Sequence, residues 1–231
     1  MENILEVNQL SKRYGKKIAV NGISFSIQKG QVYGLLGPNG SGKTTTLSSI
    51  LTLLKPTSGD IKVFGSKDLT AALRRCGVLL ESASYYPDLS AVANLKISCS
   101  IKGVGYSAIE PALEKVGLLS DKDYKVKTFS LGMKQRLNVA SALLNDPQFL
   151  IFDEPTNGLD PLGIAEMRQI LLALAKEGKT ILIASHLLNE MEKICSHVAI
   201  LKKGEIIDEG EIHQLMKGHE SLESYFLNIT A

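Results

Sequence analysis

The sequence predicts an α/β fold with a phosphate-binding loop, a small antiparallel β subdomain before that loop and a helical subdomain inserted later in the chain. Three observations support this fold class. Residues 37–44 read Gly-Pro-Asn-Gly-Ser-Gly-Lys-Thr and match the phosphate-loop pattern G-x-x-x-x-G-K-[ST] without a mismatch. Residues 3–30 alternate apolar and polar side chains over short runs broken by glycines, which is typical of antiparallel strands. From about residue 87 to residue 145 the helical period dominates, and strand-like runs resume after it.

Composition limits the possible functions. The 231-residue chain is 44% hydrophobic and 22% charged, so neither disorder nor a fibre is indicated. Its net charge of +2 is weaker than nucleic-acid-binding proteins usually show. No apolar run approaches the ~20 residues that span a bilayer, and Met1–Glu6 lacks the features of a signal peptide. We therefore expect a chain that is soluble when expressed alone and binds no nucleic acid, with Cys76, Cys99 and Cys195 as reduced, structural thiols of a cytosolic protein.

The phosphate loop lies between a strand-like run at residues 31–36 and a helix expected over residues 45–51. Its glycines allow backbone N–H groups to converge on an anion, and the helix N-terminus adds partial positive charge. Lys43 would reach the β- and γ-phosphates of a nucleoside triphosphate, and the Thr44 hydroxyl would bind Mg²⁺. The alternative is a glycine-rich turn that carries a lysine by chance. The full match and its context favour nucleotide binding.

In the N-terminal sheet, whose clearest strand is residues 23–27, Tyr14 has basic neighbours at Arg13, Lys16 and Lys17. An exposed aromatic side chain beside basic residues could stack on a purine and attract its phosphates. An ordinary turn tyrosine is an equally good interpretation from these residues alone.

After the first helix, strand-like runs follow at residues 61–65 and 76–80, and Glu81 comes directly after the second. Because ligands of open α/β sheets bind outside the carboxyl ends of the strands, we expect Glu81 to face the site. In the helical segment, Ser90 and Ser130 are expected to cap helix N-termini, and residues 107–110 match a capping box. Residues 121–127 are expected to form a solvated loop.

Polar residues follow two strands in the second half of the chain. The strand over residues 148–152 is apolar enough to be central and is followed by Asp153 and Glu154, while the strand over residues 180–184 ends in Ser185-His186. Asp153 can hold Mg²⁺ on the nucleotide, Glu154 can polarise an attacking water, and His186 could contact the γ-phosphate. Asp153 and Glu154 could instead belong to an ordinary solvated turn, but their occurrence in a chain with a phosphate loop makes this the weaker interpretation. The other expected elements are a helix over residues 163–177, a hairpin over residues 198–208 and short helices over residues 211–231.

Together these segments resemble the nucleotide-binding subunit of an ATP-binding cassette (ABC) transporter over essentially the whole chain. The phosphate loop, a signature segment similar to L-S-G-G-Q, a Walker B strand with its glutamate, a D-loop and a switch histidine occur in the family's order. The signature lies at residues 129–136, Phe-Ser-Leu-Gly-Met-Lys-Gln-Arg, and separates this family from other phosphate-loop NTPases.

The resemblance implies how ATP is bound and hydrolysed. Tyr14 stacks on adenine, Asp153 supports the metal, Glu154 is the catalytic base and His186 contacts the γ-phosphate. The residues that would hold the phosphates and Mg²⁺ are Gly37, Asn39, Gly40, Ser41, Gly42, Lys43, Thr44 and Thr45.

The resemblance also implies a head-to-tail dimer. Ser130 and Gly132 would touch the γ-phosphate bound to the other subunit, and Asp160 would communicate across the interface. The free N–H groups at the start of the helix that Ser130 begins suit an anion. One subunit would therefore hold only half of each site.

Two positions depart from the family pattern. Glu81 stands where the family usually has the Q-loop glutamine, and a carboxylate would be repelled by the γ-phosphate unless Mg²⁺ or water lies between them. Glu81 is therefore a candidate for both catalysis and metal binding. Met133 replaces the usual glutamine of the signature. The combination of Glu81 with this signature resembles that of the ATPase subunits of bacterial exporters that confer self-immunity to lantibiotics. These exporters belong to a wider group of multidrug and antibiotic exporters.

We therefore predict an ATPase that binds ATP and Mg²⁺, pairs with a second ATPase subunit as a homodimer, and powers export of a drug, antibiotic or lantibiotic-like peptide through a separate integral membrane permease. It would be a peripheral protein on the cytoplasmic face of the cell membrane. Residues 82–87, which include two tyrosines, would receive the permease's coupling helix; a structural tyrosine pair is a nearly equal interpretation of this segment. The single domain, residues 1–231, would comprise a core (1–86 and 146–215), a helical subdomain (87–145) and a helical tail (216–231).

The alternative is a non-transport ABC ATPase that acts on DNA or ribosomes. Such proteins usually carry a coiled-coil insertion or a second cassette, and neither occurs in this sequence.

Overall fold

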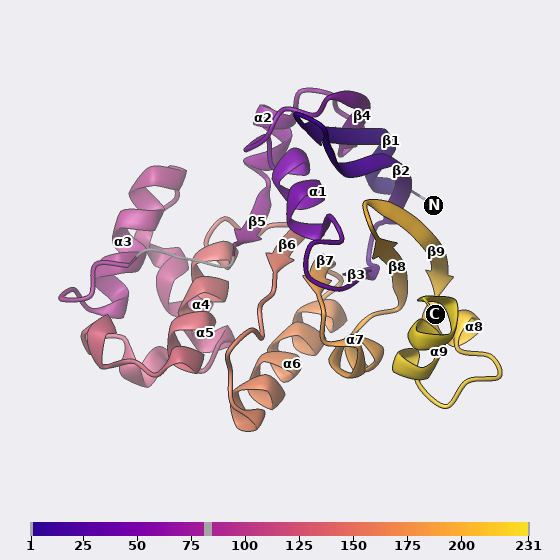
Figure 1. Cartoon of the computed structure of the whole chain (residues 1–231). Coiled ribbons are helices and arrows are strands. Elements are labelled where there is room, and N and C mark those ends of the chain that lie inside the picture. The colour runs from indigo at the N-terminus through magenta and orange to yellow at the C-terminus, as the bar shows by residue number, and fades with distance from the viewer. Residues whose placement is uncertain (1, 81–84, 231) are drawn as a thin grey trace.

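The computed structural model describes residues 2–80 and 85–230 and confirms the predicted α/β fold class, with two β-sheets and surrounding helices (Figure 1). The smaller sheet is antiparallel and contains, in spatial order, β2 (Lys17–Gln28), β1 (Asn3–Tyr14) and β4 (Ser58–Val63). The larger sheet contains, in spatial order, β5 (Cys76–Leu79), β6 (Phe149–Asp153), β7 (Thr180–Ser185), β3 (Val32–Leu36), β8 (His197–Lys202) and β9 (Glu205–Glu211). Neighbouring strands of this sheet run parallel, except that β9 is antiparallel to β8.

The central strands of the larger sheet are apolar on both faces because both faces are covered. Along β6, Phe149 and Ile151 belong to a core cluster with the smaller sheet and helix α1 (Lys43–Ile50). Leu150 and Phe152 belong to a second cluster with the helices on the other face. This alternation follows from the two-residue period of a strand. Burial on both sides fixes β6 and, with it, the acidic residues at its carboxyl end.

The loop between β3 and α1 requires glycine at two positions. Gly37 has a backbone φ of 151° and Gly42 has one of 115°, values that residues with a side chain rarely adopt. A Cβ at Gly37 would lie 2.2 Å from the carbonyl oxygen of Leu201, and one at Gly42 would lie 2.8 Å from that of Ala19. The glycines therefore let the loop pass close to β8 and β2 before it enters α1.

Between β5 and β6 the chain is helical, as predicted, and Figure 1 shows this part beside the β5 edge of the larger sheet. Its helices are α3 (Ala91–Lys102), α4 (Ile109–Lys115) and α5 (Leu131–Leu143), with 3-10 turns at Tyr106–Ala108, Leu119–Asp121 and Val126–Thr128. These helices share a hydrophobic cluster with the sheet, and the proposed subdomain limits at residues 87 and 145 stay a prediction.

Two predicted caps are confirmed in the helical part. The Ser90 hydroxyl accepts a hydrogen bond from the Ala93 N–H at 3.2 Å, and the Ser130 hydroxyl accepts one from the Met133 N–H at 3.1 Å. Each serine has extended backbone angles before its helix, as an N-cap requires. Ser130 thereby fixes the start of α5.

Two local predictions in the helical part are wrong. The capping box at residues 107–110 does not form, because a 3-10 turn runs directly into α4 and Ala108, whose side chain makes no cap, precedes the helix. Ser107 lies inside that turn and lacks the extended backbone that an N-cap needs. The loop at residues 121–127 is not fully solvated, because Val126 is 2% exposed and packs in the core.

The remaining helices are α2 (Leu69–Leu73), α6 (Pro161–Lys176), α7 (Leu188–Ile194), α8 (Ile212–Leu215) and α9 (Leu222–Thr230). The predicted helix after β6, the hairpin β8–β9 and the short C-terminal helices are confirmed. None of the helices in residues 2–80 and 85–230 has the length and apolar character needed to cross a membrane.

The three cysteines are free and buried. Burial raises the pKa of Cys76 and of Cys195 to about 12 and also raises the pKa of Cys99. Because the thiolate is the reactive form, we expect the native protein at pH 8 to react with Ellman's reagent at least about 10²-fold more slowly than the protein unfolded in guanidinium. Rapid labelling of any thiol in the native protein would contradict this structural role.

Candidate functional site

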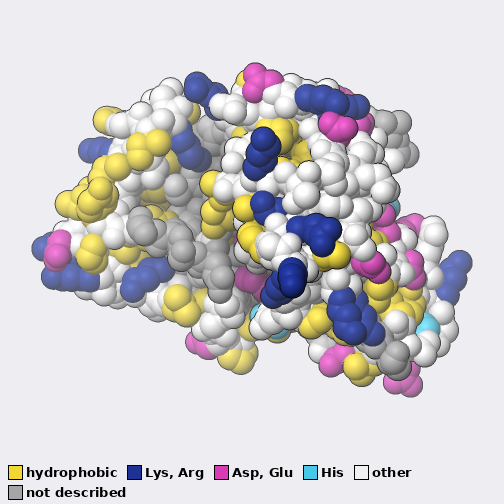
Figure 2. All heavy atoms as spheres, turned by 45° about the horizontal axis from the view of Figure 1, so that its top comes forward, with side chains coloured by type: hydrophobic (Ala, Val, Ile, Leu, Met, Phe, Trp, Pro, Cys, Tyr) yellow, Lys and Arg dark blue, Asp and Glu magenta, His cyan; other side chains and the backbone are white. Residues whose placement is uncertain are grey.

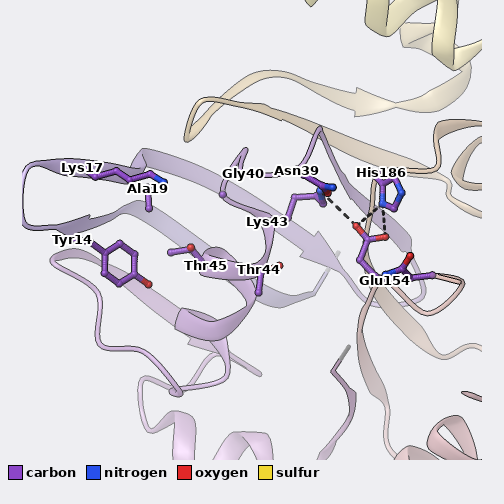
Figure 3. Close-up of a pocket in the computed structure, with 12 residues that line it drawn as sticks. Tyr14, Lys17, Ala19, Asn39, Gly40, Lys43, Thr44, Thr45, Glu154 and His186 are labelled. Carbon is purple, nitrogen blue, oxygen red and sulfur yellow. Dashed lines mark hydrogen bonds and ion pairs between the residues drawn. The ribbon is translucent and has the colours of Figure 1, made fainter. Parts of the chain in front are cut away.

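A pocket of about 360 Å³ lies where the phosphate loop meets the carboxyl ends of β6 and β7 (Figure 3). Its lining residues come from β1, β2, the phosphate loop, α1 and the segments that follow β6 and β7. They are Tyr14, Lys17, Ala19, Asn39, Gly40, Gly42, Lys43, Thr44, Thr45, Glu154, Asn157 and His186. The structure thus brings together nine of the residues that the sequence predicted for the site.

Lys43 is the buried cation of this pocket, with an exposed fraction of 5%. Its Nζ donates hydrogen bonds to the carbonyl oxygens of Gly37 at 2.7 Å and Pro38 at 3.3 Å, and lies 3.7 Å from Oε1 of Glu154. Burial lowers the pKa of Lys43, while the nearby carboxylates of Glu154 and Asp153 oppose that shift. An anion bound in the pocket would further stabilise the charged form of this buried ammonium.

Glu154 is placed by the pairing of β6 with β7. Asp153 is in register with Ala184, and the Glu154 N–H donates to the Ala184 carbonyl oxygen at 2.9 Å. Both carboxylate oxygens of Glu154 lie within 3.0 Å of Nδ1 of His186, and the Ser185 hydroxyl donates to Oε2 at 3.4 Å. These contacts aim a buried carboxylate into the pocket.

The backbone of Glu154 is in the left-handed region, at φ 48°. Residues other than glycine and asparagine rarely adopt this backbone conformation. Such backbone strain is concentrated at functional sites. The strain is maintained by the backbone hydrogen bonds on either side of the residue, from Glu154 N–H to Ala184 and from the Asn157 N–H to the Glu154 carbonyl oxygen at 3.1 Å.

The other end of the pocket is formed by the β1–β2 hairpin. Figure 3 shows Tyr14 at the end opposite Glu154 and His186, with Lys17 and Ala19 on the neighbouring strand. The Tyr14 ring is 50% exposed, so one end of the pocket carries an accessible aromatic surface. This position favours the nucleotide-binding interpretation of Tyr14 over the ordinary turn tyrosine.

Sequence reasoning missed Ala19 and Asn157 as lining residues. Asn157 lies three residues after Glu154 in the same tight turn, so its spacing was a usable signal. Ala19 carries no chemical signal, and only the hairpin geometry brings it to the pocket.

Other predicted residues lie behind the pocket. Gly37 and Ser41 are buried within the phosphate loop, and the Ser41 hydroxyl has no hydrogen-bond partner in the described part of the chain. Asp153, 2% exposed, is the last residue of β6. Glu81 lies outside the described residues. Among the residues that are described, no group of three or more His, Cys, Asp and Glu side chains is arranged to hold a metal ion.

Ser130, Gly132 and Asp160 do not line the pocket. Ser130 and Gly132 lie at the exposed start of α5, and Asp160 caps α6 by accepting a hydrogen bond from the Gly163 N–H at 2.8 Å. The two segments are neighbours, because a Cβ on Gly158 would lie 3.2 Å from the side chain of Leu131. The structure therefore separates these residues from the phosphate loop of the same chain.

Comparisons with known proteins agree with this geometry. A family model described as "ABC transporter" matches residues 20–157. The chain is 45% identical to the bacitracin transport ATP-binding protein BcrA of Bacillus licheniformis, over 94% of this chain and 72% of that protein. It is 44% identical to the lantibiotic transport ATP-binding protein SrtF of Streptococcus pyogenes, over 97% and 96% of the two chains. It is also similar to the dimeric post-hydrolysis structure of the ATP-binding cassette MJ0796 bound to ADP and phosphate, with a TM-score of 0.79 and 26% identity over 90% of this chain and 98% of that one.

Proposed function

Because this chain belongs to the ABC transporter family and is one of its ATP-hydrolysing subunits, we propose that it powers export of an antibiotic or lantibiotic-like peptide through a separate membrane permease. The observation that carries the ATP-hydrolysing part of this proposal is the meeting of Lys43, Glu154 and His186 in one pocket beside the phosphate loop. Two relatives that match most of the chain are named for bacitracin and lantibiotic transport, which supports this substrate class. The subunit would act at the cytoplasmic face of the membrane.

In the proposed reaction, Glu154 accepts a proton from the attacking water as the water oxygen bonds to the γ-phosphorus of ATP. The bond from that phosphorus to the bridging oxygen breaks, and ADP leaves with the electron pair. His186 holds both carboxylate oxygens of Glu154 and so fixes the direction in which the base points. Lys43 stabilises the negative charge on the phosphates.

The residues present fit Mg²⁺. Thr44 lines the pocket, and the Asp153 carboxylate is buried at the end of β6, close enough to raise the pKa of Lys43. Mg²⁺ prefers oxygen ligands and usually combines one or two protein groups with phosphates and waters. We propose that Thr44 and Asp153 hold the ion, with Glu81 as a further candidate. Bound there, the ion would neutralise phosphate charge.

We further propose that two copies of the chain close over two ATP molecules. Ser130, Gly132 and Asp160 lie away from the pocket of their own chain, where a second copy could use them. The free N–H groups at the start of α5 favour an anion such as the partner's γ-phosphate. The dimeric form of the similar cassette supports this arrangement.

A groove of about 410 Å³ between β5 and the helical part is the proposed docking site for the permease. Tyr85 and Tyr86 line it, together with Ile97 and Ile101 of α3. The Ile101 side chain is 81% exposed, and Figure 2 shows hydrophobic side chains gathered over the helical part at the left of the view. An exposed apolar surface beside a groove suits a protein partner.

The test is a pull-down of the tagged chain from detergent-solubilised native membranes, with partners identified by mass spectrometry. Recovery of a polytopic membrane protein supports the transporter function. Loss of resistance to a peptide antibiotic on deletion of that partner would support the proposed substrate class. Recovery of only ribosomal or DNA-repair proteins, with the chain absent from membranes, would overturn both statements in favour of the non-transport class.

We expect the Ile101→Asp substitution to lower recovery of the permease about tenfold or more, because a charge would replace an apolar contact at the interface. The ATPase activity of the isolated chain should not change, since Ile101 lines this groove and not the nucleotide pocket. Leu227→Asp is the matched control, because Leu227 is also exposed, at 61%, but lies on α9. Equal recovery with both variants would contradict the assignment of the groove.

A further inference from the structure

Lys12 occupies a defined position beside the aromatic ring at one end of the pocket. Its Nζ lies over the ring of Tyr14, 5.2 Å from the ring centroid. The same Nζ donates a hydrogen bond to the carbonyl oxygen of Lys55 at 2.7 Å. This distance to the ring is within the ~6 Å range of a cation–π interaction.

The carbonyl group that holds Lys12 is itself fixed to the end of β1. The Arg13 N–H donates to the Thr57 hydroxyl at 3.0 Å, and the Thr57 N–H donates to the Ser11 carbonyl oxygen at 2.8 Å. The loop after α1 is therefore attached to β1 on both sides of Lys12. The ammonium group is held between this loop and the ring, although Lys12 is a long and otherwise flexible side chain.

Tyr14 lines the pocket, whereas Lys12 does not. Lys17, the cross-strand partner of Tyr14, also lines it. Lys12 therefore contacts the ring without itself lining the pocket, while the ring is also part of the pocket wall. A half-exposed tyrosine would otherwise be free to take several orientations.

We propose that Lys12 is a positioning residue for nucleobase recognition: it holds the Tyr14 ring from behind so that the other face stacks on the adenine of ATP. The cation also withdraws electron density from the ring, which favours stacking on an electron-rich purine. The inference rests on the proposed function, in which Tyr14 binds the base. It adds a residue that contacts neither the nucleotide nor the reacting atoms.

The test compares two ligands of the purified full chain by titration calorimetry in the presence of Mg²⁺: ATP and inorganic tripolyphosphate, which lacks a base. Lys12→Met keeps the alkyl stem and removes the cation. It should weaken ATP binding about two- to fivefold more than tripolyphosphate binding. Lys12→Arg should retain the wild-type ratio of the two affinities, because a guanidinium also stacks on an aromatic face.

Lys16→Met is the matched control, because it removes the same charge from the exposed hairpin turn, and the cation over the Tyr14 ring is that of Lys12. It should change both affinities equally. In a Tyr14→Ala background, the additional Lys12→Met substitution should leave the ratio unchanged, since the ring through which Lys12 acts is gone.

The outcomes separate the inference from the function on which it rests. If Tyr14→Ala lowers the ratio of the two affinities but Lys12→Met does not, or if Lys12→Met still lowers it in the Tyr14→Ala background, the role of Lys12 is overturned and the base site stands. If Tyr14→Ala leaves the ratio unchanged, stacking at Tyr14 is overturned together with the inference. Thermal unfolding of each variant shows whether it is folded.

Discussion

The Glu154→Gln variant should bind ATP as the wild type does and hydrolyse it about 10²–10⁴-fold more slowly, as expected for the loss of a general base. The amide has nearly the same shape as the carboxylate but cannot take a proton from water. Glu154 is 8% exposed and lies within 3.0 Å of His186, and the replacement removes the one carboxylate among the described residues that line the pocket. Turnover measured by phosphate release and affinity measured by calorimetry test the two halves of the prediction.

Glu223→Gln is the control, because Glu223 is an exposed carboxylate in the first turn of α9 and does not line the pocket. Its turnover should equal that of the wild type. Near-normal hydrolysis by Glu154→Gln would remove Glu154 from its proposed role. Loss of ATP binding in that variant would instead show that Glu154 acts mainly through its contact with Lys43, 3.7 Å away.

The parts of the site that the sequence predicted are those whose chemistry is encoded locally. The phosphate loop is a contiguous motif, and its glycines are needed where backbone passes within 2.2–2.8 Å of a would-be Cβ. Glu154 and His186 follow two apolar runs that become neighbouring parallel strands, so both must reach the same edge of the sheet. The serine caps of α3 and α5 were likewise readable, because capping depends on a few adjacent residues.

The parts that escaped prediction depend on contacts between distant segments. The sequence did not indicate that β4 would join the N-terminal hairpin, because a strand's partners are set by long-range pairing. Helices α2 and α7 are short, at 5 and 7 residues, and are stabilised by packing rather than by a long periodic pattern. Nothing in the sequence indicated that His186 contacts Glu154 directly. The expected contact of His186 with the γ-phosphate stays a prediction.

We expect Lys43→Met to weaken ATP binding about 30-fold or more, because truncating one partner of a buried charge pair costs about 2–5 kcal/mol. Lys43 is buried and hydrogen-bonded to the backbone of the loop, whereas the other lysine that lines the pocket, Lys17, lies at the opposite end (Figure 3). Calorimetry with ATP measures the loss. Lys203→Met is the control, since Lys203 is exposed in the β8–β9 turn and does not line the pocket. Equal affinity in the two variants would contradict phosphate binding by Lys43.

In the nucleotide-free protein, the same substitution should change the free energy of unfolding in a way that depends on pH. Burial lowers the pKa of Lys43 below its ordinary value of 10.5, so the unfolded chain holds that proton more tightly than the folded chain. This group therefore makes the wild type more stable as pH rises from the lowered pKa toward 10.5, and Lys43→Met lacks that gain. Denaturant unfolding of both proteins at neutral and at alkaline pH should show the stability of the variant, relative to the wild type, falling as pH rises. A constant difference would mean that the ammonium is not disfavoured by burial, and that its affinity for phosphate has another source.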